Sequence, residues 1–385
     1  RLWNSMTQIQ IAHAAHDDWN QAAQECCDAL SKTSATGPNQ ATLGLVYVTD
    51  YLADDLKNII SHLTDQTGIN QWVGTVGMGI CAGSSEFFDR PALAVMTMSL
   101  DEQDYKIIHT INDEQEPLPV AMQEWIIKTT PLLGIVHGDG NNPNILHLVE
   151  EFASASGCFL VGGLTASRQT SYQIAGSLEE GGLTGGGLSG VLFAPSVEVA
   201  TGLSQGCSPI GESHIVSDCV DNVIVGIDGR GALDVFKEDI GDVLARDLNR
   251  VAGYIHAAFP IEGSDTGDYL VRNLVGIDPE QGWLAVGGDI KPGERILFVR
   301  RDPQSAEEDF VSMLTKLKKR LPGDPKGGVY YSCIARGPNM FGTEGREAGI
   351  IHDILGDFPL IGFYANGEIS NNRLYGYTGV IALFM

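Results

Sequence analysis

The sequence predicts a mixed α/β fold in two halves, built from mixed β-sheets flanked by helices. Short apolar runs recur along the chain, and residues 43–48 are apolar on both faces, as expected for a central strand. Three stretches also share one order of elements, strand–helix–strand–strand, which indicates repeated units. We therefore expect one sheet-and-helix unit to recur, with tight turns at many of the 47 glycines.

The first and last copies of this unit match best. The first has a strand at 43–48, a helix at 50–63, a second strand from Val73 and a third at 92–98. The last has strands at 329–333, 359–364 and 377–384 around a helix at 347–355. Gly74 and Gly79 have the same spacing as Gly362 and Gly367, which favours duplication. The alternative is that any α/β protein shows elements at this spacing.

The middle copy is weaker, with strands at 133–137, 159–163 and 190–193 and a helix at 145–152. Before the first copy, residues 9–30 have the apolar spacing of a helix with one buried face. After the middle copy the chain is rich in strands, and residues 197–206, 211–216 and 221–227 are strand-like. We place a domain boundary there, with an N-terminal domain at 6–200 and a C-terminal domain at 201–385.

The C-terminal half contains further elements before the last copy. Helices are expected at 231–245 and 248–259, and strands at 269–277, 283–287 and 295–299. Asp302 is positioned to cap a helix at 304–321, which has acidic residues in its first turn and basic residues in its last. Both charge placements favour a helix because they complement its dipole.

Composition limits the function. The chain of 385 residues has a net charge of −25, which argues against nucleic-acid binding and against anionic membrane surfaces. No stretch approaches the roughly 20 apolar residues of a membrane helix, and we expect no signal peptide. The seven cysteines include no C-x-x-C pair, so zinc spacing is absent and a reducing, cytoplasmic location is predicted.

Polar residues follow the strand ends of the last copy, where α/β sheets form ligand crevices. Cys333 and Arg336 follow its first strand, and Asn366 and Glu368 follow its second. Arg336 can clamp a carboxylate or phosphate with its planar guanidinium. Its alternative role is structural, as the partner of a nearby glutamate (Glu344, Glu347 or Glu368).

These side chains suggest an amino-acid-like ligand, since Arg336 would hold its carboxylate and Glu368 its amine. The alternative is that they only brace turns. The other candidate ligand-binding residues are Gly337, Tyr364, Gly367, Tyr377 and, as a second anion contact, Arg272. Cys333 is a candidate nucleophile, but a packed thiol is the simpler reading because no histidine lies beside it in sequence.

The sequence requires no cofactor, although haem is compatible with it. His137 is the best-placed histidine for haem iron, followed by His214 and His352. The alternative for His137 is a turn residue that hydrogen-bonds the backbone. No C-x-x-C-H motif exists, so any haem would be held without covalent bonds.

Several motifs together resemble the FIST family (F-box and intracellular signal transduction proteins). They are YLVRNLVGID from Tyr269, SCIARG from Ser332 and GFYANGEI from Gly362. The N-terminal FIST domain would match from Thr42 to about Val197, including FLVGGL from 159, and the C-terminal domain from about 206 to 385. The resemblance therefore covers nearly the whole chain.

The resemblance implies a sensory module of bacterial type that binds a small ligand, and not an enzyme. Amino acids have been proposed as ligands of the family, and some bacterial members are regarded as haem-based nitric oxide sensors. We expect a stand-alone cytoplasmic sensor that signals to a separate protein, such as a histidine kinase or a cyclic-dinucleotide enzyme. A haem-based nitric oxide sensor, a cysteine-dependent enzyme using Cys333 and a ligand-free scaffold are the alternatives.

Overall fold

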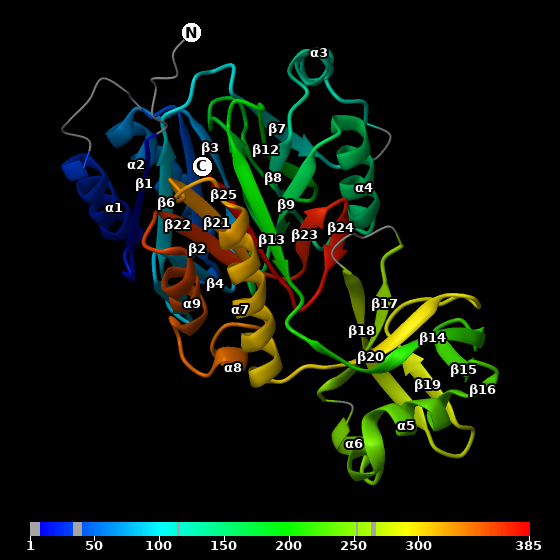
Figure 1. The fold of residues 1–385 in the computed structure, drawn as a ribbon. Helices are drawn as coiled ribbons and strands as arrows, with labels where there is room; N and C mark the ends of the chain where they lie inside the picture. The colour runs from blue at the N-terminus through cyan, green and yellow to red at the C-terminus, as the bar shows by residue number, and fades with distance from the viewer. Residues whose placement is uncertain (1–7, 34–40, 114–115, 252, 263–266) are drawn as a thin grey trace. The chain divides into compact units, whose positions relative to one another are not determined.

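The computed structural model describes residues 8–33, 41–113, 116–251, 253–262 and 267–385. It divides into two compact units, shown in Figure 1. The first comprises Arg1–Ser204 and Val311–Met385, and the second comprises Gln205–Phe310. In the part of the chain described here, no helix is both long enough and apolar enough to cross a membrane.

The first unit contains three six-stranded sheets whose strands follow one common order. Sheet one runs β1 (Ile9–Ala14), β6 (Leu93–Met98), β2 (Leu43–Thr49), β3 (Gln71–Gly77), β10 (Gln173–Gly176) and β11 (Leu183–Thr184). Sheet two runs β7 (Tyr105–Ile111), β12 (Leu188–Phe193), β8 (Leu133–Gly138), β9 (Phe159–Leu164), β23 (Glu368–Asn371) and β24 (Arg373–Tyr375). Sheet three runs β13 (Val199–Ser204), β25 (Gly379–Phe384), β21 (Gly327–Cys333), β22 (Leu360–Ala365), β4 (Gly79–Ala82) and β5 (Ser85–Phe88).

Each sheet combines four strands of one repeat with a hairpin of another. The pairs β2–β3, β8–β9 and β21–β22 are parallel, and the other neighbours in these sheets are antiparallel. Hairpin β4–β5 of the first repeat joins sheet three, β10–β11 of the second joins sheet one, and β23–β24 of the third joins sheet two. Each repeat thus gives its hairpin to the sheet of another repeat, and the three exchanges close a cycle. This confirms the repeated units that the sequence predicts, and the middle copy is as complete as the others.

Helices cover the outer faces of the sheets, as Figure 1 shows. Helices α1 (Trp19–Thr33) and α2 (Leu56–Thr67, preceded by the 3₁₀ turn η1, Asp50–Asp55) pack on sheet one. Helices α3 (Val120–Thr129) and α4 (Ile145–Ser156) pack on sheet two. Helices α7 (Pro303–Arg320), α8 (Pro338–Phe341) and α9 (Arg346–Leu355) accompany sheet three. Along β2, Val46 and Val48 face the helices while Leu45 and Tyr47 face the central core, so both faces are buried.

A glycine lets the parallel strands of each repeat lie close together. A Cβ on Gly74 would lie 1.8 Å from the carbonyl oxygen of Val46, its partner across the pair. Gly162 and Gly362 occupy the equivalent positions, where a Cβ would lie 1.8 Å from Val136 O and 1.6 Å from Tyr330 O. The glycine at this position is therefore a steric requirement of the repeat.

The second unit is a closed antiparallel barrel. Its strands run β14 (Ser208–Val220), β20 (Arg295–Arg300), β17 (Ile255–Pro260), β18 (Tyr269–Asp278), β19 (Trp283–Val286) and β15 (Val223–Ile227), with β16 (Arg230–Gly231) beside β15. The long strand β14 also pairs with β15, which closes the sheet on itself. Helix α5 (Ala232–Ala245) packs Phe236 on Phe298 at 4.8 Å between ring centroids, and α6 (Leu248–Val251) follows.

Two predicted helices are corrected. Residues 9–14 form strand β1 instead of the start of a helix, because they pair along the edge of sheet one, with Ile9 opposite Met98. Within 248–259, helix α6 covers Leu248–Val251, and residues 255–260 form β17 between β18 and β20. In both cases pairing with strands distant in sequence outweighs the helical periodicity.

The compact units follow a different division from the domains expected at 6–200 and 201–385. The third repeat begins with β13, and the barrel follows directly after this strand. Helix α7 then carries the chain back into the first unit. Asp302 does cap this helix, since its Oδ1 accepts a hydrogen bond from Ser305 N at 2.8 Å.

Candidate functional site

The turns that follow the second parallel strand of each repeat meet in a ring of backbone hydrogen bonds. Each donor lies four residues after the close-packed glycine of its repeat, and each acceptor lies two residues after that of another repeat. The bonds run from Met78 N to Tyr364 O at 3.3 Å, from Asn366 N to Leu164 O at 3.2 Å, and from Ala166 N to Val76 O at 3.1 Å. The cyclic topology therefore brings three distant turns together.

A pocket of about 230 Å³ lies at this ring, and we call it the strand-end pocket. It is lined by Met78, Gly140, Asn141, Thr165, Ala166, Ser167, Ser171, Ile334 and Asn366. Thr165 and Ala166 are buried, whereas Asn141 and Asn366 are exposed. All three repeats contribute, and the site lies at the carboxyl ends of parallel strands, where α/β sheets bind ligands.

Asp139 connects the pocket to a glycine-rich loop. Its buried carboxylate accepts a hydrogen bond from Asn141 N at Oδ1 and one from Gly186 N at Oδ2, both at 2.9 Å. The Asn142 side chain donates to Gly186 O at 2.7 Å and so joins the same loop. Asp139 therefore links the backbone of Asn141 to the loop at Gly186.

A series of hydrogen bonds connects the pocket residue Thr165 to strands of the central core. The hydroxyls of Thr165 and Thr75 are 2.6 Å apart, and Thr75 donates to Tyr172 O at 2.9 Å. On the same row of sheet one, Gln173 lies opposite Thr75 and donates to His137 O at 2.7 Å. The pocket floor is thus hydrogen-bonded to strands of the first and second repeats.

Tyr47, His137 and Tyr331 occupy equivalent positions of the three repeats and meet in the core. The hydroxyl of Tyr47 lies 2.9 Å from His137 Nε2 and 2.7 Å from the hydroxyl of Tyr331. Complete burial lowers the pKa of His137 to about 3, so its imidazole is neutral at ordinary pH. His137 is a buried residue of β8, as the strand expected at 133–137 implies, and its Nε2 faces Tyr47.

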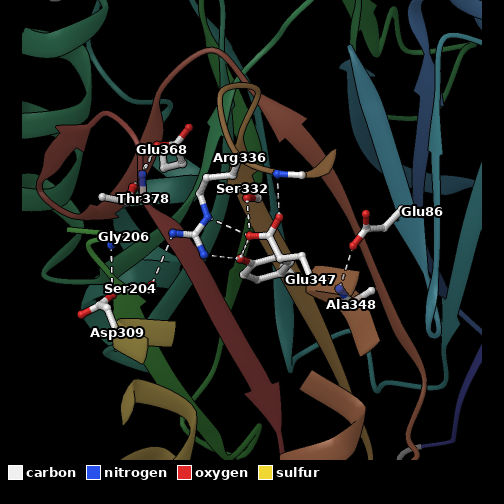
Figure 2. A network of polar contacts seen from close by, with 12 residues as sticks. Glu86, Ser204, Gly206, Asp309, Ser332, Arg336, Glu347, Ala348, Glu368 and Thr378 are labelled. Carbon is white, nitrogen blue, oxygen red and sulfur yellow. Dashed lines mark hydrogen bonds and ion pairs between the residues drawn. The ribbon is translucent and has the colours of Figure 1, made fainter. Parts of the chain in front are cut away.

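Arg336 belongs to a buried polar network, shown in Figure 2. Its Nε donates to Glu347 Oε1 at 2.7 Å, and neither side chain has exposed surface. Glu347 also accepts from Ser332 Oγ at 2.8 Å and from Gly337 N at 3.0 Å. Of the glutamates considered as partners of Arg336, the structure pairs Glu347 with it.

Glu368 is the second carboxyl of this region. Its Oε2 accepts bonds from Thr378 N at 3.1 Å and from the Thr378 hydroxyl at 2.9 Å. Complete burial raises the pKa of Glu368 to about 8, although Thr378, Arg336 and Cys333 favour the charged form. The carboxyl is therefore largely protonated near neutral pH. Cys333 is buried here and does not line the strand-end pocket.

Glu86 is a residue that the sequence analysis missed. It comes from the swapped strand β5 and accepts bonds from Gly345 N at 2.9 Å and Ala348 N at 2.7 Å, at the start of α9. Burial and the neighbouring Glu347 raise its pKa to about 7. Only the exchange of hairpins between repeats places it here, so no local sequence pattern signals it.

The structure separates the residues expected to bind a ligand. Asn366 lines the strand-end pocket. Gly337 and Tyr364 are buried near Glu347, and the ring of Tyr364 contacts Phe88 at 4.4 Å. Gly367 accepts a bond from Leu164 N at 2.9 Å. Tyr377 adopts a positive φ of 66° in the turn before β25, and Arg272 lies on β18 of the barrel.

The remaining candidate histidines lie near carboxylates. His214, in the barrel, lies 2.6 Å from Asp228 and 2.9 Å from Asp239, and these hydrogen bonds raise its pKa against the opposing effect of burial. His352, on α9, lies 3.6 Å from Asp357. Within the described ranges, no group of three or more histidine, cysteine or acidic side chains is arranged to hold a metal ion.

The pocket contains residues that sequence reasoning did not select as binding residues. Asn141 follows the first strand of the middle copy, in the turn after His137, and Thr165 and Ser171 follow its second strand. The rule that selected Asn366, a polar residue after a parallel strand, also applies to Asn141 and Thr165. Position after a parallel strand is therefore the sequence signal that the pocket-lining residues Asn141, Thr165 and Asn366 share.

Comparison with known sequences agrees with this architecture. The FIST N domain profile matches residues 42–230, and the FIST C domain profile matches residues 232–371. An uncharacterized protein of Mycobacterium tuberculosis is 30% identical over 328 residues, covering 81% of this chain and 83% of the relative. An uncharacterized protein of Mycobacterium bovis is 27% identical over 388 residues, covering 98% of each. FIST domains are sensory domains of signal transduction, and this chain belongs to the FIST family.

Proposed function

We propose that the protein is a sensor that binds a small ligand in the strand-end pocket and signals to a separate partner protein. The observation that carries this proposal is the convergence of three repeats on one pocket of about 230 Å³. A ligand there would contact turns from all three sheets at once. Membership of a family of sensory domains supports the same function.

An amino-acid-like ligand held by Arg336 and Glu368 is the form of this proposal that the sequence suggests. Arg336 would have to leave Glu347, and a buried carboxylate would then lose its partner. The pocket at Asn366 needs no such rearrangement. We therefore place the ligand in the strand-end pocket and keep amino acids as one class to be tested there.

Asp139 supplies a route by which occupancy can reach the surface. The carboxylate of Asp139 accepts hydrogen bonds from the backbone N–H groups of both Asn141 and Gly186. A ligand that forms a hydrogen bond with Asn141 and shifts its backbone would therefore also shift Asp139 and Gly186. We propose that the loop at 185–187 moves or becomes ordered on binding. Such a change requires that the ligand has different affinities for the two loop states.

We propose a cytoplasmic location and a partner such as a histidine kinase or a cyclic-dinucleotide enzyme. All seven cysteines are free thiols, as is usual in a reducing compartment. The net charge of −25 favours a partner surface of basic character.

A thermal-shift screen with a filled-pocket variant tests the proposed site. Ala166→Met places a longer side chain at the pocket, where the equivalent residue of the first repeat is Met78. Ala155→Met is the matched control, since Ala155 is exposed on α4 and lines a different pocket. The screen contains the common amino acids, small amides, polyols and organic acids.

We expect at least one compound to raise the Tm of the wild type and of Ala155→Met but not of Ala166→Met. For that compound, hydrogen exchange should slow at residues 185–187. A stabilising compound that acts equally on Ala166→Met would place the ligand elsewhere. The absence of any exchange difference in the loop would remove the Asp139 route.

A further inference from the structure

The chemistry of the strand-end pocket specifies the charge of its ligand. Its polar lining residues have uncharged side chains: two carry amides, Asn141 and Asn366, and three carry hydroxyls, Thr165, Ser167 and Ser171. Met78, Ile334 and Ala166 supply the apolar part. Among the described residues that line this pocket, none carries an ionisable side chain.

The nearest charged groups along the chain are already paired or hydrogen-bonded. Arg168 follows the lining residue Ser167, but its Nε and Nη2 bind the two oxygens of Asp50 at 2.7 and 2.9 Å. Its backbone N–H also donates to Asp50, at 3.0 Å. Asp139 precedes Gly140, and its two oxygens accept from Asn141 N and Gly186 N.

Several backbone donors at the pocket are already hydrogen-bonded within the protein. The N–H groups of Met78, Ala166 and Asn366 form the hydrogen-bonded ring between repeats. The N–H of Asn141 binds Asp139. An anionic ligand would therefore meet no cation among the described lining residues, and the protein's net charge of −25 would repel it.

We infer that the strand-end pocket takes an uncharged, hydrogen-bonding molecule that carries an amide or neighbouring hydroxyls. An asparagine side chain presents both a donor and an acceptor, which is the pattern that complements an amide. The volume of about 230 Å³ is that of a site for a small molecule. The inference rests on the proposed function because it assigns the ligand class of the same site.

Four compounds of one skeleton test the charge requirement. Lactamide is neutral, lactate is an anion, alaninamide is a cation and alanine is a zwitterion, and all have the same number of non-hydrogen atoms. Saturation-transfer NMR at millimolar concentration measures their binding to the full chain. We expect lactamide to bind at least about tenfold more tightly than the other three, since an uncompensated charge costs more than the about 1.4 kcal/mol that this factor represents.

A single isosteric variant should change this preference. Asn366→Asp adds one carboxylate at the pocket rim without changing the shape of the side chain, so alaninamide should become the best ligand. Asn58→Asp is the matched control, because Asn58 is exposed on α2 and outside the pocket. It should retain the preference for lactamide.

Two results would overturn the inference, and they differ in what they imply for the site. If charged members bind as well as lactamide and all binding is lost in Ala166→Met, the ligand class is wrong while the pocket remains the ligand site. If lactamide fails to bind, or binds Ala166→Met and Asn366→Asp as it binds the wild type, the neutral-ligand site is refuted. A compound from the thermal-shift screen that requires Ala166 would then still support the sensor.

Discussion

Arg336 Nε lies 2.7 Å from Glu347 Oε1, and both side chains are entirely withdrawn from solvent. The pair links strand β21, through the turn that follows it, to helix α9 of the third repeat. Glu86 and Glu368 lie in the same region, and burial raises the pKa of both. This region therefore contains one buried ion pair and two carboxyls whose raised pKa favours the protonated form.

Breaking this ion pair should destabilise the first unit. Arg336→Met leaves Glu347 as a buried carboxylate without its cation, and such a loss typically costs about 3–5 kcal/mol. The double variant Arg336→Met, Glu347→Gln removes both charges and should recover a large part of that loss. Urea denaturation of the wild type and the two variants measures the effect. Equal stability of wild type and Arg336→Met would show that the pair contributes nothing.

Stability should decrease as pH rises towards alkaline values. The pKa of Glu368 is about 8 in the folded protein and near 4.5 in an unfolded chain. Between these values the folded state binds more protons than the unfolded state, so the free energy of unfolding falls with pH, by up to about 1.4 kcal/mol per unit. This stabilisation is fully present below about pH 4.5 and is lost as pH passes through 8.

The variant Glu368→Gln isolates this contribution. Glutamine keeps an oxygen that accepts from Thr378 but binds no proton, so the dependence of the urea midpoint on pH should become flatter. In Glu368→Gln, the stability should still fall with pH, but less than in the wild type, because Glu86 has a raised pKa of about 7. Glu124→Gln, at an exposed site on α3, serves as the control. An unchanged pH profile in Glu368→Gln would place the titrating group elsewhere.

The glycine of each parallel strand pair should tolerate no side chain. In Gly362→Ala the new Cβ would lie 1.6 Å from Tyr330 O, so strands β21 and β22 would have to separate. We expect a loss of more than about 3 kcal/mol or no folded protein. Gly349→Ala is the control, since its Cβ meets no atom within 4 Å and alanine favours a helix by about 0.8–1 kcal/mol. Soluble yield and thermal unfolding distinguish the two, and native stability in Gly362→Ala would contradict this packing.

The hydroxyl of Tyr47 should contribute more to stability than the hydroxyl of Tyr331. Tyr47→Phe removes the hydroxyl that serves both His137 and Tyr331, whereas Tyr331→Phe removes one hydrogen bond. Because His137 Nδ1 also has no hydrogen-bond partner among the described residues, Tyr47→Phe leaves its ring unpaired. We expect a cost of about 1–3 kcal/mol for Tyr47→Phe and less for Tyr331→Phe.

Chemical denaturation of both variants tests this order, with Tyr51→Phe at an exposed position as the reference. A larger loss for Tyr331→Phe than for Tyr47→Phe would reverse the assignment of the shared hydroxyl. The comparison also reports on His137, because Tyr47 is the hydrogen-bond partner of the Nε2 of its buried, neutral imidazole.

The repeats could be predicted because they are recorded in local sequence. Each has an apolar strand, a helix and a second strand in which Gly74, Gly162 or Gly362 allows close approach. The polar turn residues after these strands could be predicted too, and Asn366 does lie in a pocket. The helix expected at residues 248–259 failed because β17 forms only by pairing with β18 and β20, partners that a local window does not contain.

The sequence by itself determined the mixed α/β class, the threefold recurrence of one unit and the family, since these depend on residue patterns within short stretches. Only the tertiary structure decided which polar residues meet. Arg336 and Glu368 have the chemistry of a ligand clamp. In the structure, however, Arg336 is buried in an ion pair with Glu347, and burial favours the protonated form of Glu368. Asn141, Thr165 and Asn366 have ordinary turn chemistry, yet the exchange of hairpins between repeats brings them to one pocket. Long-range strand pairing sets that convergence, and no local propensity encodes it.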